Sequence, residues 1–339
     1  MTRGRWWLRV VMGVLVGLVV SGMTAWVAGA IYYGEVGGPR ARGALAAGFV
    51  AATALAFLLL PRRRRTLVGF LVVFAMVVVW WLRISPSNDR DWQTEVSVTP
   101  WAEISGDRVT IHGVRNFDYR TETDFLARWE ERTYDLQTLD SADFIAVYWA
   151  GPAIAHIIVS FGFGGTDYLA ISMETRKERD EEYSALAGFF KQYELVYVVA
   201  DERDVIRVRT TYRRPQEDVY VYHVRTPREN IRRVFLDYLK GMNDLRSHPE
   251  FYNTLITNCT TGVAMHTRVN PESPPMSWKV LLSGYIPEYL YKLERLDTRR
   301  PFAELRLMSN VNRRAHAADQ DPAFSQRIRE GLPVPVPLR

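Results

Sequence analysis

Three long apolar runs open the chain, at residues 10–33, 44–60 and 66–82. None contains a charged side chain, and each is long enough to cross or nearly cross a hydrocarbon core of about 30 Å. No polar face appears over roughly seventy residues, which argues against amphipathic helices of a soluble domain. The pattern predicts three transmembrane helices within residues 1–83. Tryptophans, which favour the membrane interface, stand at the ends of this region, at Trp6, Trp7, Trp80 and Trp81.

After residue 83 the pattern changes to shorter runs. Residues 84–91, with serine, proline and asparagine, predict a linker. β-Branched and aromatic runs then predict strands, at residues 109–114, 144–149, 154–163, 168–173, 195–200, 205–211 and 219–224. Strands interleaved with helices over residues 92–312 indicate an α+β domain.

Capping signals place the helices of this domain. Thr175 and Glu178 form a capping box that predicts a helix to about residue 192. Thr226 and Glu229 form another, with Pro227 at the first helical position, and predict a helix to about residue 243. Residues 286–296 predict a further helix, and residues 313–339 are polar and proline-rich, which predicts a loosely held tail.

The net charge of +5 would suit a nucleic-acid-binding protein until the arginines are located. Arg3, Arg5 and Arg9 precede the first apolar run, and four arginines fill residues 62–65, between the second and third. The positive-inside rule therefore places both segments in the cytoplasm and everything after residue 82 outside. Elsewhere the charges are of mixed sign, so we expect no nucleic acid. We expect a multi-pass protein of a bacterial inner membrane, with the lipid bilayer as partner and a periplasmic C-terminal domain.

Cys259 is the single cysteine of the chain, so it forms no intramolecular disulfide. Asn258 precedes it and is a good N-cap, which would place Cys259 in the first turn of a helix. The unpaired N–H groups and the helix dipole at that position lower the pKa of a thiol and create a nucleophile. The alternative is a buried, inert cysteine.

A thiol nucleophile needs a base, and the chain has six histidines. His266 lies roughly 10 Å along the same predicted helix, too far for a direct hydrogen bond to Cys259. His156 interrupts one of the most apolar runs of the domain, where an ionisable ring requires a partner or a pocket. It is therefore the candidate base, with a satisfied core histidine as the alternative.

Three further residues are candidates around this pair. Glu174 follows on the next predicted strand and could orient the imidazole of His156, or lie on the surface beside a helix end. Arg176 could pair with Glu174 or hold an anionic group. Asn258 could donate to an oxyanion or only cap its helix.

Metal and nucleotide chemistry lack their usual patterns here. The sequence contains no Cys-x-x-Cys, no His-Glu-x-x-His and no Gly-x-x-x-x-Gly-Lys loop. The glycines of residues 162–165 mark a turn without dinucleotide-loop spacing. We therefore expect neither a metal nor a cofactor.

Five ordered motifs between about residues 140 and 270 resemble the Lnb N-terminal periplasmic domain family. They are His156-Ile157-Ile158-Val159-Ser160-Phe161, Ile171-Ser172-Met173-Glu174-Thr175-Arg176, Asp201-Glu202-Arg203-Asp204, Phe251-Tyr252-Asn253-Thr254 and Asn258-Cys259-Thr260-Thr261.

The resemblance implies a permuted papain-like domain of the NlpC and LRAT type, with the histidine before the cysteine in the chain. It implies Cys259 as nucleophile and His156 as base, and Glu174, Arg176 and Asn258 match motif positions. We expect Glu174 and Asn258 at the catalytic centre, and Ser172 and Arg176 in contact with substrate. The characterised branch of the family moves an acyl chain of a diacylglyceryl lipoprotein from the glyceryl group to the N-terminal amine.

The function expected from these features is a membrane-anchored periplasmic thiol acyltransferase or hydrolase with a lipoprotein or another lipid-linked substrate. Anchoring favours such a substrate because it raises the effective concentration near the bilayer. Two alternatives stay open. One is a cysteine peptidase or amidase of the cell envelope, and the other is a non-catalytic envelope binding module.

Overall fold

The structure is a computed structural model that describes residues 3–34 and 36–336. The remaining residues of the predicted segments 1–83 and 313–339 lie outside the described part. Two compact units are present. The first, here called the membrane unit, comprises the chain up to Pro86 together with Tyr183–Tyr193. The second, the sheet unit, comprises Ser87–Glu182 and the chain from Glu194 onward.

The membrane unit contains α1 (Arg3–Tyr32), α2 (Pro39–Leu59) and α3 (Arg63–Leu82). All three are long and apolar enough to cross a membrane, as the hydropathy pattern predicted. Aromatic rings join the helices: the Trp26 ring lies 5.7 Å from Phe74 and 5.4 Å from Trp81.

The segment Tyr183–Tyr193 packs on the ends of these helices. The Phe190 ring stacks on Tyr33 at 5.6 Å and fills the space that a Cβ at Gly29 would need. Lys191 Nζ donates to the carbonyl oxygens of Trp81 and Ile84, at 3.0 and 3.1 Å. A lysine at this place supplies hydrogen bonds to carbonyls that have no partner within the helix at the end of α3.

The predicted helix from Thr175 to about residue 192 is wrong. The segment Tyr183–Tyr193 is a loop with one 3-10 turn at Ala187–Phe189.

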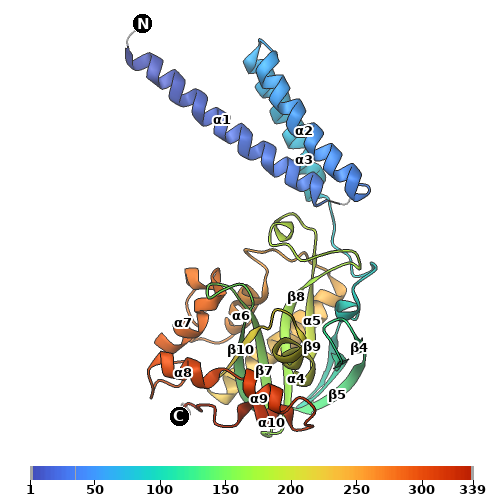
Figure 1. Ribbon diagram of the computed structural model, residues 1–339, viewed down its shortest axis with the longest axis vertical. Coiled ribbons are helices and arrows are strands. Elements are labelled where there is room, and N and C mark those ends of the chain that lie inside the picture. Colours follow the sequence, from blue (N-terminus) through green and yellow to red (C-terminus); the bar gives the residue numbers. More distant parts are fainter. Residues whose placement is uncertain (1–2, 35, 337–339) are drawn as a thin grey trace. The chain divides into compact units, whose positions relative to one another are not determined.

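The sheet unit is built on an eight-stranded sheet of order β1-β2-β9-β8-β7-β6-β10, with β5 paired to β2 (Figure 1). Its strands are β1 (Trp101–Ser105), β2 (Arg108–Arg115), β5 (Trp129–Asp135), β6 (Leu139–Tyr148), β7 (Ala155–Phe163), β8 (Asp167–Arg176), β9 (Glu194–Ala200) and β10 (Asp218–His223). A small second sheet pairs β3 (Asp118–Tyr119) with β4 (Phe125–Leu126).

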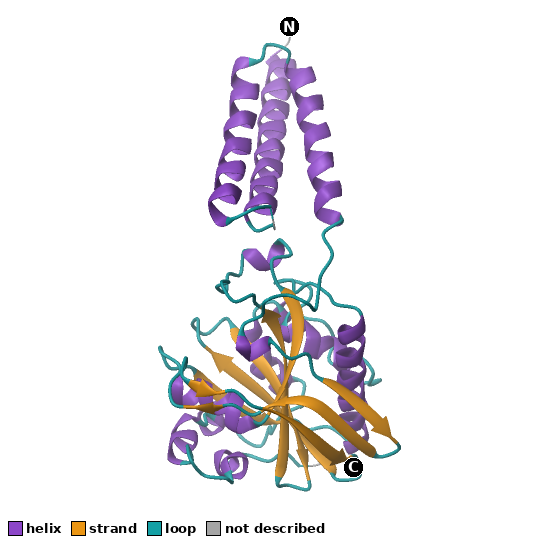
Figure 2. Ribbon diagram, turned by 90° about the vertical axis from the view of Figure 1, so that its right-hand side faces the viewer, coloured by secondary structure: helices purple, strands orange, loops and turns teal. Residues whose placement is uncertain are grey.

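Helices cover both faces of the large sheet (Figure 2). They are α4 (Glu202–Arg207), which continues as a π-helical turn at Val208–Tyr212, then α5 (Arg228–Ser247), α6 (Cys259–Thr267), α7 (Ile286–Lys292), α8 (Phe302–Ser309), α9 (Asn312–Ala317) and α10 (Phe324–Arg329). On the first face Ile158, Ala170 and Val198 pack with residues of α4, α9 and α10. On the second face the Phe161 ring lies 4.9 Å from Phe235 of α5.

Three further predicted segments differ from the structure. Residues 205–211 form α4 and its π-helical turn and not a strand, since their apolar side chains pack on one sheet face. The predicted tail from residue 313 is packed instead, because Phe324 and Ile328 are fully buried. The predicted linker, residues 84–91, is not free along its length, because the sheet unit begins at Ser87. The main-chain N–H of Ser87 donates to Glu194 Oε1 at 3.1 Å.

Candidate active site

Cys259 is the first residue of α6, as the local sequence predicted. Asn258 caps the helix: its side-chain oxygen accepts hydrogen bonds from Thr260 N at 2.9 Å and Thr261 N at 3.0 Å. Thr261 Oγ1 in turn accepts from Asn258 N at 2.8 Å and completes a capping box. Cys259 is partly exposed as a residue.

The strands that carry the other candidates separate beside this helix end. The pairing of β7 with β8 runs from Phe163 and Asp167 to Val159 and Ile171, and ends there in the described residues. Beyond that point β7 stays paired with β6, and β8 with β9. His156 lies on the unpaired edge of β7 and Glu174 on that of β8.

The two side chains meet across this gap. Nε2 of His156 lies 2.9 Å from Oε1 of Glu174, and the side chains are 13% and 24% exposed. The same oxygen accepts a hydrogen bond from Ser172 Oγ at 2.9 Å and lies 3.3 Å from Arg209 Nη2. Burial disfavours the carboxylate, but the charge and hydrogen bond of His156, together with Arg209 and Ser172, hold the pKa of Glu174 well below its usual range.

Cys259 reaches this pair from the other face of the sheet. On that face Gly262 of α6 packs against Met173, whereas His156 shares the first face with Ile158. Because Nε2 faces Glu174, Nδ1 of His156 is left for the thiol. The charges of the imidazole and the thiolate favour each other, and the main-chain N–H of Ile157 also favours the thiolate.

These contacts shift the pKa of both partners. Burial disfavours the imidazolium of His156, but Glu174 and the Cys259 thiolate outweigh it and raise the pKa of His156 to about 9. Burial also disfavours the thiolate, yet His156, the Ile157 N–H and Thr260 bring the pKa of Cys259 below its ordinary value. The site therefore favours a thiolate–imidazolium pair.

The structure gives two of the expected residues supporting contacts. Asn258 serves as the helix cap, and its amide nitrogen donates to Thr254 O at 2.8 Å. Ser172, 3% exposed, positions Glu174. These contacts do not support the expected oxyanion role of Asn258 or substrate contact by Ser172.

Arg176 does not pair with Glu174. Its side chain is buried, and it donates to Val96 O, Asn88 Oδ1 and Ser97 O at 3.0, 2.8 and 2.9 Å. The guanidinium also stacks on Trp92 at 4.4 Å. Arg176 thus holds the entry of the chain into the sheet unit. These contacts do not support the expected anion-binding role of Arg176, because each nitrogen of its guanidinium already donates to a protein acceptor.

Sequence reasoning missed Arg209. It lies in the π-helical turn Val208–Tyr212, is 5% exposed, and approaches both Glu174 and Glu217. Its signal was the same as that of His156, namely an ionisable residue inside an apolar run, but residues 205–211 were assigned to a strand.

The acidic motif of residues 201–204 proves structural. Asp201 caps α4 through Arg203 N at 2.8 Å. Glu202 binds Ser160 Oγ at 2.6 Å, and Asp204 binds Arg115 at 2.7 Å. Both carboxylates are fully buried. Their contacts hold α4 and its π-helical turn against the first face of the sheet.

His266 is engaged elsewhere, in agreement with the helical spacing. Its Nε2 lies 2.8 Å from the Tyr197 hydroxyl and its Nδ1 2.8 Å from Asp237 Oδ2. Across the described residues, no group of three or more His, Cys, Asp or Glu side chains is arranged to hold a metal ion.

Comparison with known proteins identifies the region that carries the site. Residues 125–284 match the profile of the Lnb N-terminal periplasmic domain family, and this segment includes Cys259, His156 and Glu174. No curated protein and no solved structure matches the chain significantly. Together with the three apolar helices, the match indicates a membrane-anchored protein with a periplasmic domain. Residues 125–284 are thus similar to the Lnb N-terminal periplasmic domain family.

Proposed function

We propose that this protein is a thiol acyltransferase or hydrolase that acts on the acyl chains of lipoproteins in the periplasm. The observation that carries the proposal is the position of Cys259 at the first residue of α6, where the charge of His156 lowers the pKa of the thiol while Nε2 of His156 lies 2.9 Å from Glu174 Oε1. A nucleophile at a helix N-terminus, a base and an orienting acceptor form the set that acyl transfer through a thioester requires. The order of His156 before Cys259 agrees with a permuted papain-like domain.

The reaction proceeds in two steps. The Cys259 thiolate attacks the ester carbonyl, the C–S bond forms and the ester C–O bond breaks. His156 gives its proton to the departing alcohol. An amine, or water, then attacks the thioester and gives a proton back to His156 as the thiolate leaves. The main-chain N–H of Cys259, in the first turn of α6, is the expected donor to the oxyanion.

The membrane unit brings this chemistry to its substrate. The arginine distribution and three helices long enough to cross a membrane support an inner-membrane protein whose sheet unit faces the periplasm. A tethered thiol then meets lipid-linked esters at high effective concentration.

The test is mass spectrometry of lipoprotein N-termini from cells that carry wild type, Cys259→Ala or His156→Ala. We expect the lyso form, with an N-linked acyl chain, only with the wild type. Met265→Ala is the matched control, since Met265 is an exposed residue of the same helix. Unchanged lipoproteins in every strain would reject the proposal. Cleavage of peptides without lipid would then favour a peptidase, and a wild-type phenotype of Cys259→Ala would favour a binding module.

A further inference from the structure

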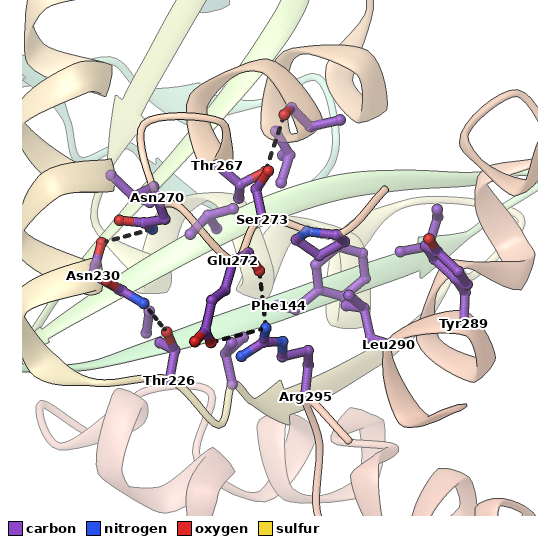
Figure 3. A pocket seen from close by; sticks show the side chains of 18 of the residues that line it. Phe144, Thr226, Asn230, Thr267, Asn270, Glu272, Ser273, Tyr289, Leu290 and Arg295 are labelled. Carbon is purple, nitrogen blue, oxygen red and sulfur yellow. Dashed lines mark hydrogen bonds and ion pairs between the residues drawn. The ribbon is translucent and has the colours of Figure 1, made fainter. Parts of the chain in front are cut away.

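An apolar cavity begins one residue from Cys259. It lies between the second face of the sheet, α5, α6 and α7 (Figure 3). Phe144, Val159 and Phe161 form its floor. The volume that the cavity encloses is about 150 Å³.

Thr260 connects the cavity to the thiol. It lines the cavity, and its Oγ1 lies 3.8 Å from Cys259 Sγ. The other lining residues of α6 are Val263, Ala264 and Thr267, which share one helical face with Thr260. The cavity therefore follows α6 away from Cys259 for about 10 Å.

The polar side chains of the wall are largely bound to neighbours. Thr267 Oγ1 donates to Ala264 O at 3.0 Å, and the Tyr289 hydroxyl donates to Pro275 O at 2.7 Å. Asn270 donates to Asn230 O at 3.2 Å. Arg295 donates to Glu272 O at 2.9 Å and pairs with its carboxylate (Figure 3). Such a wall offers hydrocarbon contacts and little for a sugar or a peptide.

We propose that this cavity receives the hydrocarbon tail of the acyl group that Cys259 carries, and that Val263 and Ala264 set the chain length it accepts. This rests on the proposed function for its substrate, but the site itself can be tested without turnover. Each methylene that enters the cavity should favour the bound tail by up to about fourfold.

The experiment uses the single cysteine of the full-length protein in lipid nanodiscs. Methyl, butyl and decyl methanethiosulfonates transfer their alkylthio group to the Cys259 thiolate, with methanesulfinate as leaving group. Intact-mass spectrometry follows the rate. In wild type we expect faster labelling as the chain lengthens. Val263→Phe should keep the methyl rate and lose the increase, whereas Met265→Phe, on the exposed side of α6, should keep both.

Partition of long reagents into lipid is common to all variants, so the ratio to wild type isolates the cavity. If Val263→Phe fails to fold, Val263→Ile decides, because it adds only one methylene to the side chain. Equal chain-length dependence in wild type and in the folded cavity variant overturns the inference. Unchanged lipoproteins with an intact chain-length effect would reject acyl transfer and leave the cavity, whereas turnover without that effect would reject only the cavity.

Discussion

Nε2 of His156 lies 2.9 Å from Oε1 of Glu174, although the two residues stand on strands that have already separated. Cys259, the first residue of α6, approaches His156 from the opposite face of the sheet, through the gap between β7 and β8. The carboxylate also keeps the imidazole charged to a pH of about 9.

Alkylation of Cys259 should show an early thiolate. Because His156 lowers the pKa of the thiol, wild type should react with iodoacetamide well below pH 8.5, about where an unperturbed cysteine titrates. His156→Ala should move the rate profile upward and lower activity by about 10²–10⁴-fold. Urea-denatured protein supplies the reference profile. A native profile that coincides with it would leave Cys259 without a catalytic part.

Replacing Glu174 should move the alkaline limit of the ion pair. The folded pKa of His156, about 9, exceeds its ordinary 6.5, so the stabilisation it contributes is complete below pH 6.5 and is lost as pH rises through 9. Glu174 has a lowered pKa, so its contribution is present above 4.5 and is lost as pH falls. Glu174→Gln should move the alkaline loss of stability toward 6.5.

Thermal unfolding of the full-length protein against pH would measure this effect. His112→Gln is a control, because His112 pairs with Glu131 on the surface of other strands. Equal pH profiles for wild type and Glu174→Gln would contradict the coupling of His156 to Glu174.

Asn258 offers a way to separate a cap from a catalytic donor. Asn258→Ser keeps a capping oxygen, so the free energy of unfolding should change little and the activity only a few-fold. Asn258→Ala should cost about 0.5–2 kcal/mol of stability. A loss of activity of about 10²–10³-fold in a stable Asn258→Ser protein would instead identify the side chain as an oxyanion donor. The measurement is the activity of each variant beside its unfolding curve.

Arg209 should matter for stability more than its neighbour Arg213. The side chain of Arg209 is 6% exposed and lies 3.3 Å from Glu174 and 3.7 Å from Glu217, so Arg209→Met removes one buried cation from both carboxylates, which keep His156 and Arg213 as partners. We expect a loss of about 3–5 kcal/mol. Arg213→Met is the control, since that side chain is 35% exposed and its pair is partly screened. Denaturant unfolding of both variants decides, and equal losses would refute the central place of Arg209.

The membrane topology can be tested by reporters that are active in one compartment. Fusions at Arg64 and at Asn88 flank α3, so they should report opposite sides of the membrane. A reporter after residue 336 should agree with the one at Asn88. If Arg64 and Asn88 reported the same compartment, the topology with three crossings would be wrong.

Local sequence determined the features that depend on neighbours in the chain. The uncharged runs predicted α1, α2 and α3, because a single apolar segment in lipid satisfies its backbone N–H and C=O groups by forming a helix. The cap at Asn258 followed from a side chain that binds N–H groups within three residues. The start of α5 was predicted within two residues, although Pro227 is its N-cap and no side chain caps it. His156 stood out because an ionisable ring in an apolar strand must have a partner.

Only the tertiary structure decided where those partners lie. The separation of β7 from β8, which lets Cys259, His156 and Glu174 meet, depends on long-range pairing with β6 and β9. Long-range contacts also explain the wrong assignment of Arg176 to the site. Its hydrogen-bond acceptors lie in residues 88–97, far from it in the sequence. Residues 205–211 read as a strand because β-branched residues suit either a sheet or a buried helix, and burial against the sheet decided between them.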